Sequence, residues 1–135
     1  MLVLVDIDGT LALRNGRNPF DWERVHTDQP NMPVVNCVRA LSNQGHEIVF
    51  VTGREELLRE STMGWIREHL GISGRLLMRV TGDYRPDVVV KSEFIEQEAI
   101  NPKDVLLVFD DRESVVKMWR EKFGLVCFQV AEGNF

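Results

Sequence analysis

Polar residues that could do chemistry follow several of the apolar runs in this sequence. Asp6 and Asp8 come directly after Leu2–Val5, and a Gly-Thr pair follows them. Two carboxylates this close can share a hard cation, or they can divide the tasks of nucleophile and proton donor. In an arbitrary protein such a pair is more often the solvated turn at a strand end. The later groups of residues decide between these interpretations.

Three later apolar runs are followed by cations, a hydroxyl and further carboxylates. These residues are Thr52, Gly53 and Arg54 after Ile48–Val51, Lys91 after Val88–Val90, and Asp110 and Asp111 after Val105–Phe109. Carboxylates bind Mg²⁺, whereas hydroxyl, ammonium and guanidinium groups bind phosphoryl oxygens. Phosphoryl transfer is catalysed largely by positioning and charge neutralisation. Each residue alone would be an ordinary strand-end or surface residue, but the complete set indicates phosphoryl-transfer chemistry.

Apolar runs and helical periodicity define the elements that must position these residues. Strands are expected at Leu2–Val5, Glu47–Val51, Arg75–Arg79, Val105–Phe109 and Leu125–Val130. Helices are expected at 31–45, 62–70, 88–98 and 112–123, and the glycines at 45, 71 and 124 mark three helix ends. This alternation predicts a three-layer, Rossmann-like α/β domain with a mostly parallel five-stranded sheet. Parallel strands deliver the polar residues to one edge of that sheet.

We expect residues 1–135 to form a single domain. Two irregular stretches, Arg14–Pro30 and Thr81–Asp87, are too short for a second domain, so any cap over the site must be minimal. If the extended conformation continues past the first strand, Asp6 and Asp8 point to the same side. Asp111 is also placed to be the N-cap of the last helix, a role compatible with metal binding.

Composition narrows the classes of function. The net charge is -5, which argues against a nucleic-acid binder held by a broad basic surface but allows contact with one or two phosphates. No apolar run approaches the roughly 18 residues that cross a bilayer, and no signal-peptide pattern is present, so we expect a cytoplasmic protein without a membrane partner. Cys37 and Cys127 lie among apolar residues and are expected to be buried thiols. The sequence does not indicate an oligomeric state.

The order of these motifs resembles that of the haloacid dehalogenase (HAD) superfamily of phosphohydrolases. The superfamily signature DxDGT corresponds to Asp6–Thr10, and its later motifs correspond to Thr52, Lys91 and the pair Asp110-Asp111. The resemblance implies a HAD-type fold and an Mg²⁺ ion bound by Asp6, by the backbone carbonyl of Asp8, and by Asp110 or Asp111. It also implies that Gly9, Thr10, Thr52, Gly53 and Lys91 contact the phosphate.

Further motifs resemble the phosphatase domain of bacteriophage T4 polynucleotide kinase. They include Asn15-Gly16-Arg17, Val51–Glu55, Asp87 with Lys91, and Val116–Arg120. That family removes 3′-phosphates during nucleic-acid end healing. The resemblance implies that Arg17 and Arg54 contact phosphate oxygens and that Asp87 is important, orienting Lys91 or Arg54. The segment between Arg54 and Trp65 is shorter than in the phage enzyme.

The resemblance implies a mechanism and partners. Asp6 would form an aspartyl-phosphate, and Asp8 would protonate the leaving 3′-oxygen and then activate water. The substrates would be 3′-phosphorylated nucleic-acid ends, with terminal 2′,3′-cyclic phosphates in addition. No GxxxxGK[ST] motif is present, so a kinase domain or a ligase would lie elsewhere, and the chain is either a stand-alone phosphatase or a domain of a longer polypeptide. The alternatives are a phosphatase of small metabolites such as mononucleotides, and an inactive module that binds phosphorylated ends.

Overall fold

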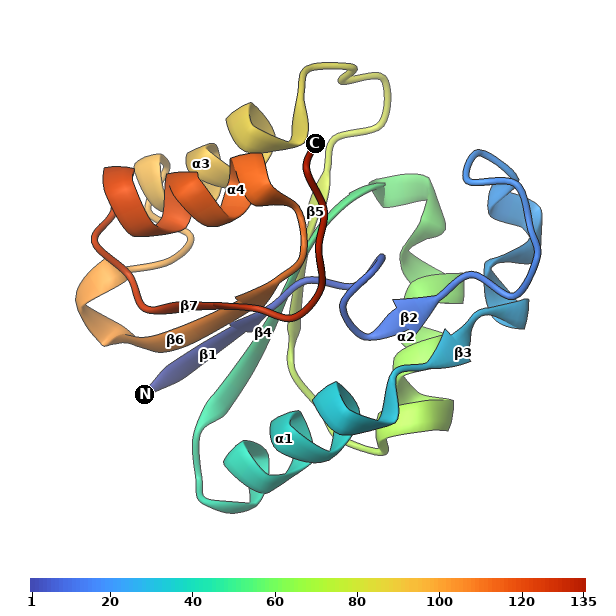
Figure 1. Ribbon diagram of the computed structural model, residues 1–135, viewed down its shortest axis with the longest axis horizontal. Helices are drawn as coiled ribbons and strands as arrows, with labels where there is room; N and C mark the ends of the chain where they lie inside the picture. Colours follow the sequence, from blue (N-terminus) through green and yellow to red (C-terminus); the bar gives the residue numbers. More distant parts are fainter.

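The central sheet of the computed structural model, which describes residues 1–135, has five parallel strands in the order β5–β4–β1–β6–β7 (Figure 1). The strands are β1 Leu2–Val5, β4 Glu47–Glu55, β5 Arg75–Arg79, β6 Val105–Asp110 and β7 Cys127–Gln129. Their pairings are all parallel, because each strand is connected to the next by a helical crossover. The predicted α/β fold class is therefore confirmed.

Helices cover both faces of this sheet (Figure 1). They are α1 Met32–Asn43, α2 Arg59–Leu70, α3 Asp87–Glu96 and α4 Glu113–Lys117, with short 3₁₀ helices at Glu56–Leu58 (η2) and Pro102–Asp104 (η3). Val3 and Val5 of β1 pack in one core cluster with α1 and α2, whereas Leu4 packs in the other with α3 and α4. The strands are apolar on both faces because both faces are covered.

A small cap precedes α1. It consists of β2 Ala12–Leu13 and β3 Gln29–Pro30, which pair antiparallel, and a 3₁₀ helix, η1 Trp22–Thr27, between them. The prediction of an irregular stretch from Arg14 to Pro30 is therefore wrong in part, because elements this short carry no detectable periodicity. The Trp65 indole N–H of α2 donates to the Asp28 carbonyl oxygen at 3.0 Å and attaches the cap to the body of the domain.

The last predicted helix differs from the observed one at its start and in its second half. Its N-cap is Arg112 rather than Asp111, and the C-terminal carbonyls of Gly133 and Phe135 accept the N–H groups of Glu113 and Ser114. The tail thus satisfies free N–H groups that a capping side chain would otherwise bind. After Lys117 the helix continues as a π-helical turn, η4 Met118–Lys122.

Other element boundaries shift by a few residues. β4 runs on to Glu55, which pairs with Arg79 after an irregularity in the ladder. α3 ends at Glu96, before Glu98, whose φ of 64° is incompatible with a right-handed helix. α2 begins three residues earlier than predicted, and β7 is confined to Cys127–Gln129.

The two cysteines have different environments. Cys127 on β7 is buried as predicted, and burial, together with the nearby Asp110, raises the pKa of its thiol to about 12. Cys37 is exposed, so the prediction that it is buried is wrong. Val34, Val35 and Val38 form the inward face of α1, and Cys37 falls on the opposite side of the helix.

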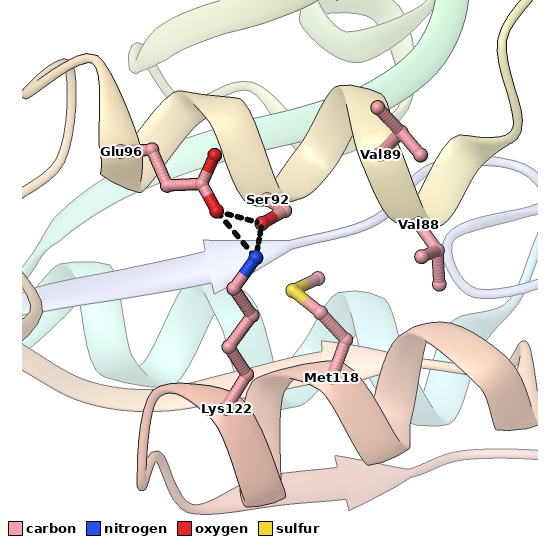
Figure 2. A pocket seen from close by; sticks show the side chains of 6 residues that line it. All are labelled: Val88, Val89, Ser92, Glu96, Met118 and Lys122. Carbon is pink, nitrogen blue, oxygen red and sulfur yellow. Dashed lines mark hydrogen bonds and ion pairs between the residues drawn. The ribbon is translucent and has the colours of Figure 1, made fainter.

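A shallow pocket lies between α3 and the α4–η4 helix (Figure 2). At one end of it, the Lys122 ammonium contacts the Ser92 hydroxyl at 2.7 Å and the Glu96 carboxylate. These contacts join the two helices on one face of the sheet, and none of the predicted site residues lines the pocket. No helix in the structure is long and apolar enough to cross a bilayer.

Candidate active site

Loops after β1 and β6 meet the first turns of α3 at the carboxyl edge of the sheet. There the Lys91 Nζ atom lies 2.7 Å from Asp6 Oδ1 and 3.0 Å from Asp110 Oδ2. The Thr10 hydroxyl donates to Asp6 Oδ2 at 2.9 Å. The side chains of these four residues are buried. Hydrogen bonds from Lys91 and Thr10 hold the Asp6 carboxylate in one orientation.

This cluster contains more negative than positive charge. Carboxylate oxygens of Asp6, Asp110 and Asp111 lie within 4.8 Å of one another, and the Lys91 ammonium contacts the first two of these residues. Burial raises the pKa of Asp6 well above its ordinary value, with Asp110 and Asp111 adding to the rise and Lys91 offsetting it in part. Burial likewise raises the pKa of Asp111. Three carboxylates against one ammonium therefore fit a divalent cation that prefers oxygen ligands.

Lys91 remains charged in this environment. Burial lowers the pKa of its ammonium, but the neighbouring Asp110 and Asp6 raise it by more, so the net shift is upward. The ammonium accordingly belongs to the site as a fixed positive charge.

Asp110, the last residue of β6, and Asp111, which follows it, differ in how freely they can bind a cation. Asp110 accepts hydrogen bonds on both oxygens, from the N–H groups of Asp111 and Arg112 on Oδ1 and from Lys91 and the Trp119 indole on Oδ2. Oδ1 of Asp111 lies 3.3 Å from the Thr10 hydroxyl oxygen, whose single proton is directed to Asp6 at the shorter distance of 2.9 Å. Asp111 therefore has the more available oxygens.

Gly9 allows this close approach of Asp111. Its φ is 83°, a conformation that L side chains rarely adopt, and a Cβ atom there would overlap the Asp111 carboxylate. The glycine of the DxDGT motif thus lets the loop after β1 lie directly against the loop after β6.

Asp8 lies beside two arginines, Arg17 and Arg54, which we call the arginine cluster. Arg54 binds its carboxylate through two nitrogens, at 2.9 and 2.7 Å, and Arg17 lies 3.6 Å from it. The Asp8 side chain is 37% exposed, whereas those of Arg17 and Arg54 are almost fully buried. The carboxylate of Asp8 is thus outside the acidic cluster.

A turn after Ile7 separates Asp6 from Asp8. The Ile7 carbonyl oxygen accepts the N–H groups of Thr10, Leu11 and Ala12, so the extended conformation ends there. The condition for the prediction that both carboxylates point to the same side, a continued extended conformation, is therefore not met. They contact different partners because the chain turns between them.

Asp28 is a site residue that the sequence motifs did not identify. It lies in the cap, accepts two hydrogen bonds from Arg17 at 2.6 and 3.0 Å, and lies 3.4 Å from Arg54. Its side chain is fully buried. The sequence offered only a polar residue within a polar stretch, because the two arginines that surround Asp28 come from distant motifs.

Asp87 contacts neither Lys91 nor Arg54, which corrects that prediction. Its carboxylate lies 2.5 Å from Arg79 and 3.7 Å from Arg112. Arg79, which was not predicted either, also donates to the Gly53 carbonyl oxygen at 2.7 Å and to backbone oxygens of the loop before α3. A Cβ atom on Gly53 would overlap the Asp87 carboxylate, so this glycine also fills a position where a side chain does not fit.

Thr52 is buried at the centre of this arrangement. It lies on β4, and its hydroxyl oxygen accepts the N–H of Arg54 at 3.1 Å. Its hydroxyl proton makes no hydrogen bond within the protein, so it can be donated to a ligand oxygen. The site thus consists of an acidic cluster, an arginine cluster and the Thr52–Gly53 segment of β4, and Arg79 joins this segment to Asp87.

Comparison with known proteins decides the family. The sequence model of the family described as "Polynucleotide kinase PNKP phosphatase domain" matches residues 1–135. The chain belongs to this family of phosphatase domains. It is 37% identical, over 123 residues, to a protein of Autographa californica nuclear polyhedrosis virus described as a bifunctional polynucleotide kinase/RNA ligase. That match covers 88% of this chain and 18% of the viral protein.

Solved structures agree with this assignment. A chain in the structure of the Pnkp1/Rnl/Hen1 RNA repair complex is 38% identical, with a TM-score of 0.92 over 98% of this chain and 43% of that chain. This polynucleotide kinase phosphatase domain thus spans less than half the length of the relatives it matches. A D,D-heptose 1,7-bisphosphate phosphatase from B. bronchiseptica, crystallised with magnesium and phosphate, has a TM-score of 0.63 at 10% identity over 93% of this chain and 78% of that chain, a likeness of HAD fold alone.

Replacement of Asp28 by Asn should lower the free energy of unfolding by about 3 kcal/mol, because it leaves two buried guanidinium groups without their full counter-charge. Urea denaturation followed by fluorescence measures this. The matched control is Glu47→Gln, which removes the exposed Glu47–Arg75 pair and should cost less than about 1 kcal/mol. Equal losses in the two variants would contradict the importance of Asp28.

Replacement of Asp6 by Asn should stabilise the protein in EDTA at pH 8. Because the folded-state pKa of Asp6 is raised, its contribution to stability is complete below its ordinary pKa near 4 and is lost as the pH rises through the raised value. We therefore expect Asp6→Asn to have a higher free energy of unfolding than the wild type under these conditions.

The gain should shrink as the pH is lowered through 4 and below, where Asp6 becomes protonated in both the folded and the unfolded state. Thermal unfolding at several pH values measures this, with Asp104→Asn, an exposed carboxyl, as the control. If Asp6→Asn instead destabilised the protein at pH 8 in EDTA, the ionised Asp6 carboxylate would be stabilising in the metal-free protein, and the prediction would be contradicted.

Proposed function

We propose that this chain is a magnesium-dependent phosphatase that removes the 3′-phosphate from nucleic-acid ends. The observation that carries the proposal is the separation of two neighbouring carboxylates into different environments. Asp6 lies among the acidic residues beside Lys91, and Asp8 lies among arginines at the open side of the site. Such a separation suits a nucleophile and a proton donor.

Asp6 is the proposed nucleophile. Hydrogen bonds from Lys91 and Thr10 fix its carboxylate, and Asp6 and Asp111 are the residues that would hold Mg²⁺, with the backbone carbonyl of Asp8 as a further ligand. Bound Mg²⁺ would supply charge neutralisation for the carboxylates and the phosphoryl oxygens. Asp110 positions Lys91 and leaves cation binding to Asp111.

The reaction proceeds in two steps. An Asp6 oxygen attacks phosphorus, the bond from phosphorus to the 3′-oxygen breaks, and Asp8 gives its proton to that oxygen. Asp8 then takes a proton from water, which attacks the aspartyl-phosphate and releases inorganic phosphate and free Asp6. Lys91, Thr52 and Gly53 bind the phosphoryl oxygens throughout. The N–H groups of Gly9 and Thr10 already donate to the carbonyl oxygens of Ala12 and Ile7, so these two residues shape the loop beside the phosphate.

The arginine cluster prepares Asp8 for this role. Arg54 is bound to Asp8 by two hydrogen bonds, and a phosphate that enters the site competes for the same guanidinium. Transfer of Arg54 from Asp8 to the phosphate frees the carboxyl group to hold a proton. Asp28 keeps Arg17 in place during this exchange, because its two hydrogen bonds to Arg17 are independent of Asp8.

The open side of the site supports a large substrate. Asp8 is 37% exposed beneath a cap of one short hairpin and one 3₁₀ helix, so the group that leaves from its side can extend into solvent. We also propose that residues 1–135 act as one domain beside a kinase or ligase activity elsewhere in the protein, as the descriptions of its relatives suggest. Terminal 2′,3′-cyclic phosphates are a second proposed substrate.

Phosphate release from a 3′-phosphorylated oligonucleotide tests the proposal. We expect release that requires Mg²⁺ and stops in EDTA, with at least about tenfold lower kcat/KM for a 3′-mononucleotide and none for a 5′-phosphorylated oligonucleotide. A 2′,3′-cyclic end tests the second substrate in the same assay. Equal release from all substrates would indicate a phosphatase of small metabolites, and no release from any would indicate an inactive binding module.

A further inference from the structure

Trp22 is an aromatic residue in contact with the arginine cluster. It begins η1 in the cap, and its ring centroid lies 5.3 Å from the Arg17 Cζ atom and 5.8 Å from the Arg54 Cζ atom. The two arginine side chains are buried, whereas Trp22 is 36% exposed. One part of the indole thus packs on the guanidinium groups, and another part remains in solvent.

Trp22 packs on the same arginine that binds the proposed proton donor. Arg54 contacts both Trp22 and the Asp8 carboxylate, so the indole and the proposed proton donor flank the same guanidinium. In the proposed function, Asp8 protonates the 3′-oxygen of the last nucleotide. The nucleoside attached to that oxygen must therefore extend from Asp8 into the region beside the cap.

The charge of the chain also favours an aromatic contact. The net charge is -5, and the arginines nearest to Asp8 already have carboxylate partners. Binding of an oligonucleotide through many phosphate contacts is therefore unfavourable. Base stacking on an aromatic ring needs no positive charge and accepts any base.

We propose that Trp22 is the stacking surface for the base of the 3′-terminal nucleotide. The inference rests on the proposed function. It makes Trp22 the residue that determines preference for a nucleotide 3′-phosphate over other phosphate esters. Phe20, which is 82% exposed on the same segment of the cap, is the aromatic residue available to the next base.

The test compares a 3′-phosphorylated oligonucleotide that ends in a normal nucleotide with one that ends in an abasic nucleotide. Wild-type protein should prefer the normal end by about 5- to 150-fold in kcat/KM, the range that corresponds to stacking of one base. In Trp22→Leu this ratio should fall to about 1–2, and in Trp22→Phe it should be intermediate. Phe128→Leu removes an exposed aromatic residue from β7 and should retain the wild-type ratio.

The ratio separates stacking from a purely structural role. If Trp22 only held the arginines in place, its replacement would slow both substrates equally and leave the ratio unchanged, which would overturn the inference. Equal rates for both substrates in wild-type protein would overturn it too, while the proposed function would stand. Failure of wild-type protein to release phosphate from either substrate would overturn both.

Fluorescence gives an independent measurement without turnover. Trp65 and Trp119 are buried, so acrylamide quenches mainly Trp22. In Asp6→Asn protein saturated with the normal 3′-phosphorylated oligonucleotide, Trp22 should be protected from quenching. Saturation with the abasic oligonucleotide should leave it accessible, and equal protection by the two would contradict the stacking contact.

Discussion

The buried contact of the Lys91 ammonium with the carboxylates of Asp6 and Asp110, close to a third carboxylate, Asp111, is the constraint on which the rest of the site depends. Lys91 comes from α3, Asp6 from the end of β1 and Asp110 from the end of β6, so this contact joins elements that are distant in sequence. Because a buried charge without a partner is strongly destabilising, these elements must meet in this arrangement. The remaining excess of negative charge opposes folding in the absence of a cation and favours cation binding in the folded protein.

The second feature that shapes function is the turn between Asp6 and Asp8. Three N–H groups converge on the Ile7 carbonyl oxygen, and this local hydrogen bonding sends the two carboxylates into opposite electrostatic environments. The arginine cluster around Asp8 depends in turn on Asp28 of the cap. The short cap therefore does more than cover the site, because it supplies the counter-charge that keeps the buried Arg17 in place.

Most of the fold and the acidic cluster could be predicted because they follow from regular patterns. Apolar runs mark the strands, and a parallel sheet brings together the residues that follow them. Contacts between distant side chains could not be predicted in this way, which is why Asp28 and Arg79 were missed and the partner of Asp87 was wrong. The prediction that Asp111 caps the last helix was wrong because carbonyl oxygens of the C-terminal tail accept the first N–H groups of that helix. The prediction that Cys37 is buried was wrong because apolar neighbours in sequence do not determine which face of a helix a residue lies on.

The central claim is that the acidic cluster binds Mg²⁺ whereas the Asp8 side chain transfers protons. Calorimetric titration with Mg²⁺ tests this claim most directly. The protein is titrated as wild type, as Asp111→Asn and as Asp8→Asn. We expect Asp111→Asn to lose at least about tenfold in Mg²⁺ affinity, and Asp8→Asn to bind Mg²⁺ as wild type does and to be inactive as a phosphatase. Loss of Mg²⁺ affinity in Asp8→Asn with retention in Asp111→Asn would contradict the account.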